Sequence, residues 1–109
     1  MPVDLKDRTA LVTGSTSGIG KATALALAAR GAHVLVVGRN AERAERVVAE
    51  IEGGGGWASF RLTTLGDLES VRDLARWATE VGGGHVDILV HNAGIALLGA
   101  PNTARVVFA

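Results

Sequence analysis

A glycine- and hydroxyl-rich octet, Thr13-Gly14-Ser15-Thr16-Ser17-Gly18-Ile19-Gly20, constrains the fold of this chain more than any other stretch. It separates a short run of β-forming residues, Thr9–Val12, from a run of helix-forming residues. A strand that turns through glycines into a helix presents free backbone N–H groups at the positive end of the helix dipole. Gly14 and Gly18 suit positive φ, and Gly20 allows close approach of the helix. The octet therefore predicts a loop that binds a pyrophosphate.

Three hydroxyl residues fill the space between the first two glycines. Ser15, Thr16 and Ser17 are expected to add hydrogen-bond donors to phosphate or ribose oxygens. The alternative interpretation is a tight strand–helix turn that binds no ligand. We favour the binding loop, because glycines and hydroxyls at this spacing are more specific than either alone.

Apolar runs and helical periods alternate along the rest of the chain. Continuous aliphatic runs predict buried strands, and apolar stripes at helical spacing predict helices, with Asn40 and Asp67 as N-caps and Gly31 as a helix end. Trp57, Phe60 and Trp77 are expected to be packing residues. The expected strands are Thr9–Val12, His33–Val37, Trp57–Leu62 and Val86–Val90, and the expected helices are Ile19–Arg30, Ala41–Glu52 and a third whose apolar stripe is Leu68, Val71, Leu74, Ala75, Ala78 and Val81.

The order β-α-β-α-β-α-β argues for a parallel sheet with helices on both faces. Right-handed crossovers from a central first strand then give the strand order 3-2-1-4. The prediction is an α/β fold, part of a Rossmann-like doubly wound parallel sheet, in a single domain over residues 1–109.

Composition removes several classes of partner. The formal net charge is zero, so no basic field attracts nucleic acid or anionic lipid, and neither is an expected partner. The chain has no cysteine, which excludes disulfides and thiolate metal sites and fits a reducing compartment. No signal-peptide core or membrane-length apolar run is evident, so we expect a cytoplasmic location.

The spacing Gly-x-x-x-Gly-x-Gly differs from the Gly-x-Gly-x-x-Gly fingerprint of the commonest dinucleotide fold. With Thr13 in front and Ile19 between the last two glycines, the octet resembles the cofactor loop of the short-chain dehydrogenase/reductase family. A second segment, His91-Asn92-Ala93-Gly94, resembles the family's Asn-Asn-Ala-Gly turn, with histidine in place of the first asparagine. The resemblance covers about Leu5 to Leu98. It implies an oxidoreductase that transfers hydride between a nicotinamide coenzyme and a carbonyl or alcohol.

The residues after the second expected strand bear on the choice of coenzyme. An acid at this strand end clamps the ribose diol of NAD and repels a 2′-phosphate. Here the position holds Gly38, followed by Arg39, whose planar guanidinium matches phosphate oxygens. We therefore expect NADP, with NAD less favoured. The alternative is that Arg39 is an ordinary solvated residue at a strand end.

The resemblance also implies positions for the adenine and the ribose. Where the family places an aspartate against the adenine, this chain has Thr64, whose hydroxyl, with the Leu65 backbone, would serve the adenine edge. A general-base role for His91 is disfavoured, because a strand-end histidine usually satisfies a local hydrogen bond. The expected coenzyme-binding residues are Gly14, Ser15, Thr16, Ser17, Gly18, Ile19, Gly20, Arg39, Thr64, Leu65, Asn92, Ala93 and Gly94.

No catalytic residue can be carried over. Family members use a serine and a Tyr-x-x-x-Lys pair, whereas this chain has no tyrosine and its only lysines are Lys6 and Lys21. We expect the cofactor-binding half of such an enzyme, inactive alone, with Ile88–Val90 as an exposed edge that invites self-association. Two alternatives stay open. One is a non-catalytic dinucleotide-binding module that acts as a sensor or assembles with a partner chain, and the other is a structural domain that binds nothing.

Overall fold

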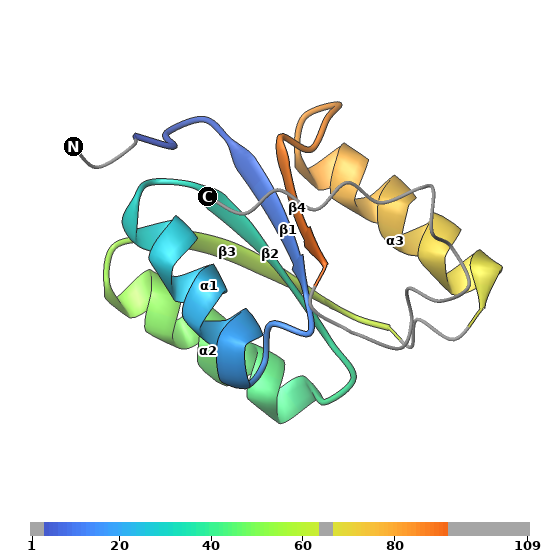
Figure 1. The fold of residues 1–109 in the computed structure, drawn as a ribbon, viewed down its shortest axis with the longest axis horizontal. Coiled ribbons are helices and arrows are strands. Elements are labelled where there is room, and N and C mark those ends of the chain that lie inside the picture. The colour runs from blue at the N-terminus through green and yellow to red at the C-terminus, as the bar shows by residue number, and fades with distance from the viewer. Residues whose placement is uncertain (1–3, 64–66, 92–109) are drawn as a thin grey trace.

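The computed structural model describes residues 4–63 and 67–91. Strands and helices alternate along this part of the chain (Figure 1). They are β1 (Thr9–Thr13), α1 (Gly18–Ala29), β2 (His33–Gly38), α2 (Ala41–Gly53), β3 (Trp57–Leu62), α3 (Leu68–Val81) and β4 (Ile88–His91). Each expected element is present, and the largest difference is that β4 begins at Ile88 rather than Val86.

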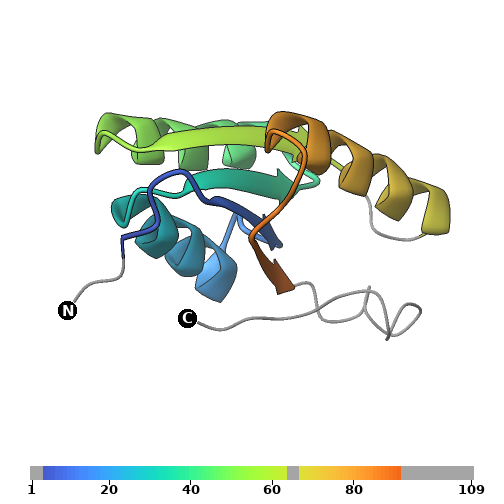
Figure 2. The same ribbon diagram turned by 90° about the horizontal axis from the view of Figure 1, so that it is seen from above.

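The four strands form one parallel sheet in the order β3-β2-β1-β4, which confirms the predicted order. Figure 2 shows the strands in that sequence, from β3 in yellow-green to β4 in red-orange. Register pairs Val12 of β1 with Val36 of β2 on one side and with Val90 of β4 on the other. The carboxyl ends of β1, β2 and β4 therefore lie along the same edge of the sheet.

Helices cover both faces of the sheet, with α1 and α2 on one side and α3 on the other (Figure 1). Successive residues of β1 and β2 point to opposite faces, so Val12 and Val36 pack under α1 and α2 while Leu11 and Leu35 pack under α3. This two-sided burial explains why β2 is continuously aliphatic rather than alternating.

The expected helix ends are confirmed. The Asn40 side chain accepts from the Arg43 N–H at 3.0 Å at the start of α2, and Asp67 accepts from the Ser70 N–H at 2.7 Å at the start of α3. Gly31 follows α1 with φ of 100°, a conformation that suits glycine. Capping side chains therefore set the starts of α2 and α3, and a glycine in the left-handed conformation sets the end of α1.

Part of the packing prediction is wrong. Trp57 is 59% exposed and Phe60 is 37% exposed, because β3 is the outermost strand of the sheet. Trp57 instead lies flat on buried His33, with ring centroids 3.7 Å apart, and burial lowers the pKa of that histidine. Leu68 and Ala75 of the expected α3 stripe are also exposed, whereas Trp77 of α3 is partly buried and packs against the core between α3 and the sheet, as predicted.

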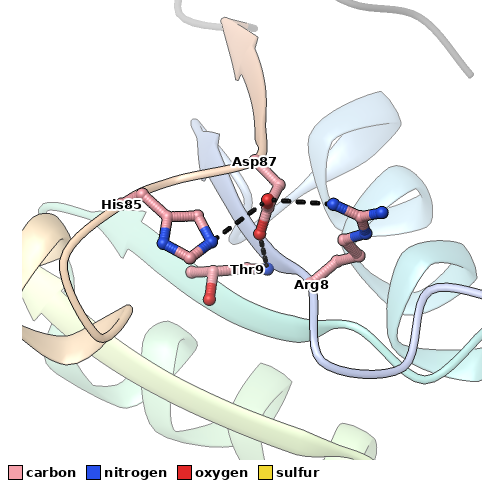
Figure 3. Close-up of polar contacts among 4 residues, drawn as sticks. All are labelled: Arg8, Thr9, His85 and Asp87. Carbon is pink, nitrogen blue, oxygen red and sulfur yellow. Dashed lines mark hydrogen bonds and ion pairs between the residues drawn. The ribbon is translucent and has the colours of Figure 1, made fainter.

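Asp87 fastens the amino ends of β1 and β4 (Figure 3). One carboxylate oxygen accepts from the Thr9 N–H at 2.8 Å, and the other lies 3.4 Å from Arg8 Nη1 and 3.2 Å from His85 Nε2. The Thr9 hydrogen bond, with smaller contributions from His85 and Arg8, holds the pKa of Asp87 below its usual value although burial opposes the shift. The carboxylate form is therefore the one that the fold stabilises.

Replacing this carboxylate should alter stability in a pH-dependent way. Asp87→Asn is expected to cost about 1.5–3 kcal/mol of stability at neutral pH, the range for a hydrogen bond to a charged group. Because the folded pKa is the lower one, the stabilisation is present above the unfolded pKa of about 3.9 and is lost as pH falls through the folded value. The free energy of unfolding in urea, measured from pH 7 to pH 3, should fall less steeply toward low pH for the variant than for the parent chain.

Asp73→Asn is the matched control, since Asp73 makes only an exposed i,i+3 contact with Arg76. This variant should leave the pH dependence of the free energy of unfolding unchanged. Parallel pH profiles for Asp87→Asn and the parent chain would contradict the role given to Asp87.

Candidate functional site

The candidate site lies at the carboxyl edge of the sheet, where β1 and β2 end. The chain leaves β1 at Thr13 and enters α1 at Gly18, and it leaves β2 at Gly38 and continues into Arg39. The strand order reverses on either side of β1, since β2 and β3 lie to one side and β4 to the other. Ligands of open α/β sheets bind at such a switch point, outside the carboxyl ends of the strands.

The loop between β1 and α1 has the expected glycine conformations. Gly14 has φ of 62° and Gly18 has φ of 56°, in the left-handed region that favours glycine. Among residues 4–63 and 67–91, no atom beyond the chain neighbours and the backbone of α1 lies within 4 Å of the position that a Cβ on Gly18 would take, so this residue borders open space there. Gly20 is buried, which agrees with its expected role in close helix packing.

The amino end of α1 differs from those of the other two helices. Ser17 occupies its N-cap position without a side-chain hydrogen bond, and no acidic residue lies in its first turn. In contrast, Asn40 and Asp67 cap α2 and α3, whose first turns each carry a glutamate. In the described part of the chain, no N-cap side chain bonds to the first-turn amides of α1, and this turn carries no acid of its own, which favours an external anion. Ile19 projects beside these amides and is 77% exposed.

Ser15 turns inward rather than toward the open face of the loop. It is fully buried, and its backbone N–H donates to the Val37 carbonyl at 3.2 Å. Its hydroxyl accepts from the Val37 N–H at 2.9 Å and donates to the Val37 carbonyl at 3.4 Å. This hydroxyl therefore fastens the loop to β2, and its expected contact with phosphate stays a prediction. Thr16 is half-buried and Ser17 is exposed.

Arg39 follows β2 with an exposed side chain and forms no ion pair with any residue in 4–63 or 67–91. Lys21, the other cation near the loop, pairs with Glu50 of α2 at 3.0 Å. Arg39 is therefore the guanidinium that remains available at the end of β2 for an anionic ligand.

Gly38 has a packing role that inspection of the sequence missed. Its φ is not positive, so the backbone alone does not require glycine. A Cβ at this position would lie 2.6 Å from Thr16 Cγ2 and 3.2 Å from Thr16 Oγ1. The Thr16 side chain thus occupies the space beside the end of β2. The one sign of this contact is that position 38 is a glycine although its backbone conformation does not require one.

Five expected positions lie outside the described residues: Thr64, Leu65, Asn92, Ala93 and Gly94. The register of Thr13 with His91 places the end of β4 beside the end of β1. The described part of the site therefore consists of Gly14–Gly20 and Arg39. Within the described ranges, no cluster of histidine and carboxylate residues could hold a metal ion.

Comparison with known proteins identifies the family. The family model described as short chain dehydrogenase matches residues 8–106. This chain belongs to the short chain dehydrogenase family. Its oxidoreductase relatives share both the sequence and the fold described above.

Two relatives illustrate the sequence similarity. The chain is 44% identical over 103 residues to dehydrogenase/reductase SDR family member 13 of Homo sapiens, covering 93% of this chain and 27% of the relative. It is 43% identical over 95 residues to a 3beta-hydroxysteroid dehydrogenase of Mediterraneibacter gnavus, covering 87% and 33%. The chain therefore spans about a quarter to a third of the length of these relatives.

Solved structures of this family share the fold. A hydroxysteroid dehydrogenase from Escherichia coli superposes with a TM-score of 0.79 at 40% identity, covering 84% of this chain and 38% of that one. A short chain dehydrogenase from Burkholderia cenocepacia in complex with NADP gives a TM-score of 0.77 at 44% identity, covering 84% and 37%. In the described part of this chain, none of the helices has the length and apolar character needed to cross a membrane.

Proposed function

We propose that this chain binds a nicotinamide dinucleotide, NADP in preference to NAD, as the coenzyme-binding portion of a short-chain dehydrogenase. The observation that carries the proposal is the amino end of α1, which begins at the positive-φ Gly18 and has neither a capping side-chain bond at Ser17 nor an acidic residue in its first turn. The family membership supports it, and the NADP complex of a relative supports the choice of coenzyme.

The binding mode follows from the charges at the end of the sheet. The diphosphate bridge lies against the first-turn amides of α1, where the helix dipole favours negative charge. Ile19, exposed beside these amides, is covered by the bound coenzyme. Arg39 donates to the 2′-phosphate that distinguishes NADP from NAD. The remaining proposed contacts, to the adenine and the ribose, belong to Thr64, Leu65, Asn92, Ala93 and Gly94.

A titration with NADPH tests this binding mode. The fluorescence of the reduced nicotinamide should change saturably as folded protein is added, and NADP should displace it at a lower concentration than NAD. Displacement by both coenzymes at equal concentration would contradict the NADP preference. A signal that never saturates would contradict the binding site itself.

When bound, the coenzyme would supply the hydride, and the described residues of this chain would bind and orient the coenzyme. A proton must also move in carbonyl reduction, and this chain contains no tyrosine to donate it in the manner of the family. We therefore expect the 109-residue chain to oxidise no NADPH above background with a broad panel of ketones and aldehydes. Absorbance at the reduced-nicotinamide band measures this, and turnover that scales with protein concentration would contradict it.

A second candidate is a dinucleotide-binding module that acts as a sensor or assembles with another chain. It is favoured by the position of β4, which pairs with β1 and has no second neighbour among the strands of the described residues. A strand edge with unpaired N–H and C=O groups invites another chain. NADPH binding without turnover, together with a defined assembly, would favour this candidate.

Self-association through β4 gives a further prediction. Sedimentation velocity at increasing protein concentration should show a shift from monomer toward larger species, because edge pairing is a second-order process. A chain that remains monomeric and melts cooperatively at high concentration would contradict it.

A further inference from the structure

Two successive residues of the glycine loop contact two successive residues at the end of β2. Ser15 exchanges three hydrogen bonds with the backbone of Val37. Thr16 then lies over Gly38, the residue at which β2 ends and after which Arg39 begins. The loop proposed to bind the diphosphate and the strand end proposed to bind the 2′-phosphate are therefore one packed unit.

The contact between Thr16 and Gly38 leaves no room for a side chain at position 38. A Cβ there would lie 2.6 Å from Thr16 Cγ2, closer than real Cβ contacts allow. Threonine is β-branched and stiff at χ1, so it yields less easily than a long side chain. The neighbouring Ser15 is fully buried and bonded to Val37, which keeps the loop from moving away as a whole.

Position 38 is also where an NAD-binding protein of this fold class places the acid that accepts from the ribose diol. We propose that Thr16 is a specificity-determining residue of the coenzyme site: its side chain occupies the space that an acid at position 38 needs, and so excludes the diol clamp. This inference rests on the proposed function. A ligand with a 2′-phosphate needs no side chain at position 38, because Arg39 supplies the donors.

The inference predicts that the two positions are coupled. Thr16→Ala removes Cγ2 and Oγ1 and leaves Cβ, which lies 3.5 Å from the new Cβ at position 38, an ordinary contact. Gly38→Asp alone should weaken NADP binding without improving NAD binding, since the aspartate and Thr16 compete for one space. Thr16→Ala with Gly38→Asp should bind NAD at least about tenfold more tightly than Gly38→Asp alone, a difference of about 1.4 kcal/mol that exceeds any effect of Thr16→Ala by itself.

Thr79→Ala is the matched control, because Thr79 is an exposed threonine of α3 that lies outside the candidate site. Thr79→Ala with Gly38→Asp should behave as Gly38→Asp alone. Calorimetric titration of the three single variants, the two double variants and the parent chain with NADP and NAD measures all the affinities. If Gly38→Asp gains NAD affinity as fully as the double variant does, the inference is overturned while the proposed function stands. If the parent chain binds neither coenzyme, it is the proposed function that fails.

A stability measurement tests the packing without any ligand. Gly38→Ala should lower Tm in the parent chain and leave it unchanged in the Thr16→Ala background, because the three atoms nearest to the added methyl group all belong to Thr16. Equal shifts in both backgrounds would overturn the inference. If Gly38→Asp fails to fold but Thr16→Ala with Gly38→Asp folds, the inference is supported. If neither folds, the comparison of Gly38→Ala in the parent chain and in the Thr16→Ala background decides.

Discussion

Gly18→Val is expected to lower the affinity for NADP and NAD alike by about a hundredfold or more. Gly18 has φ of 56°, which a β-branched residue adopts only with strain, and its substituent would project into the open space before the amino end of α1. The proposed diphosphate occupies this space. Since a hydrogen bond to a charged group contributes about 1.5–3 kcal/mol, displacing the diphosphate from two amides accounts for a loss of this size. Isothermal titration calorimetry with each coenzyme measures the change.

Gly55→Val provides a control for strain alone. Gly55 has φ of 88° and also borders open space, but it lies after α2, in the connection to β3 at the opposite edge of the sheet. Both variants should lose stability by a similar amount in urea unfolding, and only Gly18→Val should lose coenzyme affinity. Retained binding in folded Gly18→Val would show that the diphosphate does not lie against these amides.

The second large effect is expected at Arg39. Arg39→Ala should weaken NADP binding by about 10- to 100-fold, the loss of one or two charge-assisted hydrogen bonds, and change NAD binding by less than about twofold. The selectivity arises because only NADP carries the 2′-phosphate. Raising the salt concentration should weaken NADP binding more than NAD binding in the parent chain and should lose this difference in the variant.

Arg72→Ala is the control for a general loss of positive charge. Arg72 is exposed on α3, which packs on the face of the sheet opposite α1 and α2, so its removal should leave both affinities unchanged. Equal losses of NADP and NAD affinity in Arg39→Ala would remove the 2′-phosphate assignment while leaving the loop assignment intact.

The elements that were predictable from the sequence are those determined by nearby residues. Continuous aliphatic runs specified the buried strands, Asn40 and Asp67 specified two helix starts, and the glycine spacing specified the turn between β1 and α1. The strand order followed from the handedness of crossovers, which is a general property of βαβ units.

The remaining features depend on contacts between distant parts of the chain. Ser15 and Val37 are far apart in sequence, and nothing in the octet indicates that this hydroxyl turns inward while Thr16 stays partly exposed. The exposure of Trp57 and Phe60 likewise depends on the position of β3 at the edge of the sheet, which the residues of that strand do not reveal. Side-chain direction within a binding loop therefore required the packed structure.

Calorimetry on the folded 109-residue chain is the most direct test of whether the glycine loop binds a nicotinamide coenzyme. The chain should first be shown to unfold cooperatively in urea, and then be titrated with oxidised and reduced forms of both coenzymes. We predict saturable heat for one site per chain, with NADP and NADPH bound more tightly than NAD and NADH. Absence of heat with all four, from protein that unfolds cooperatively, would contradict the assignment of the glycine loop as a coenzyme site.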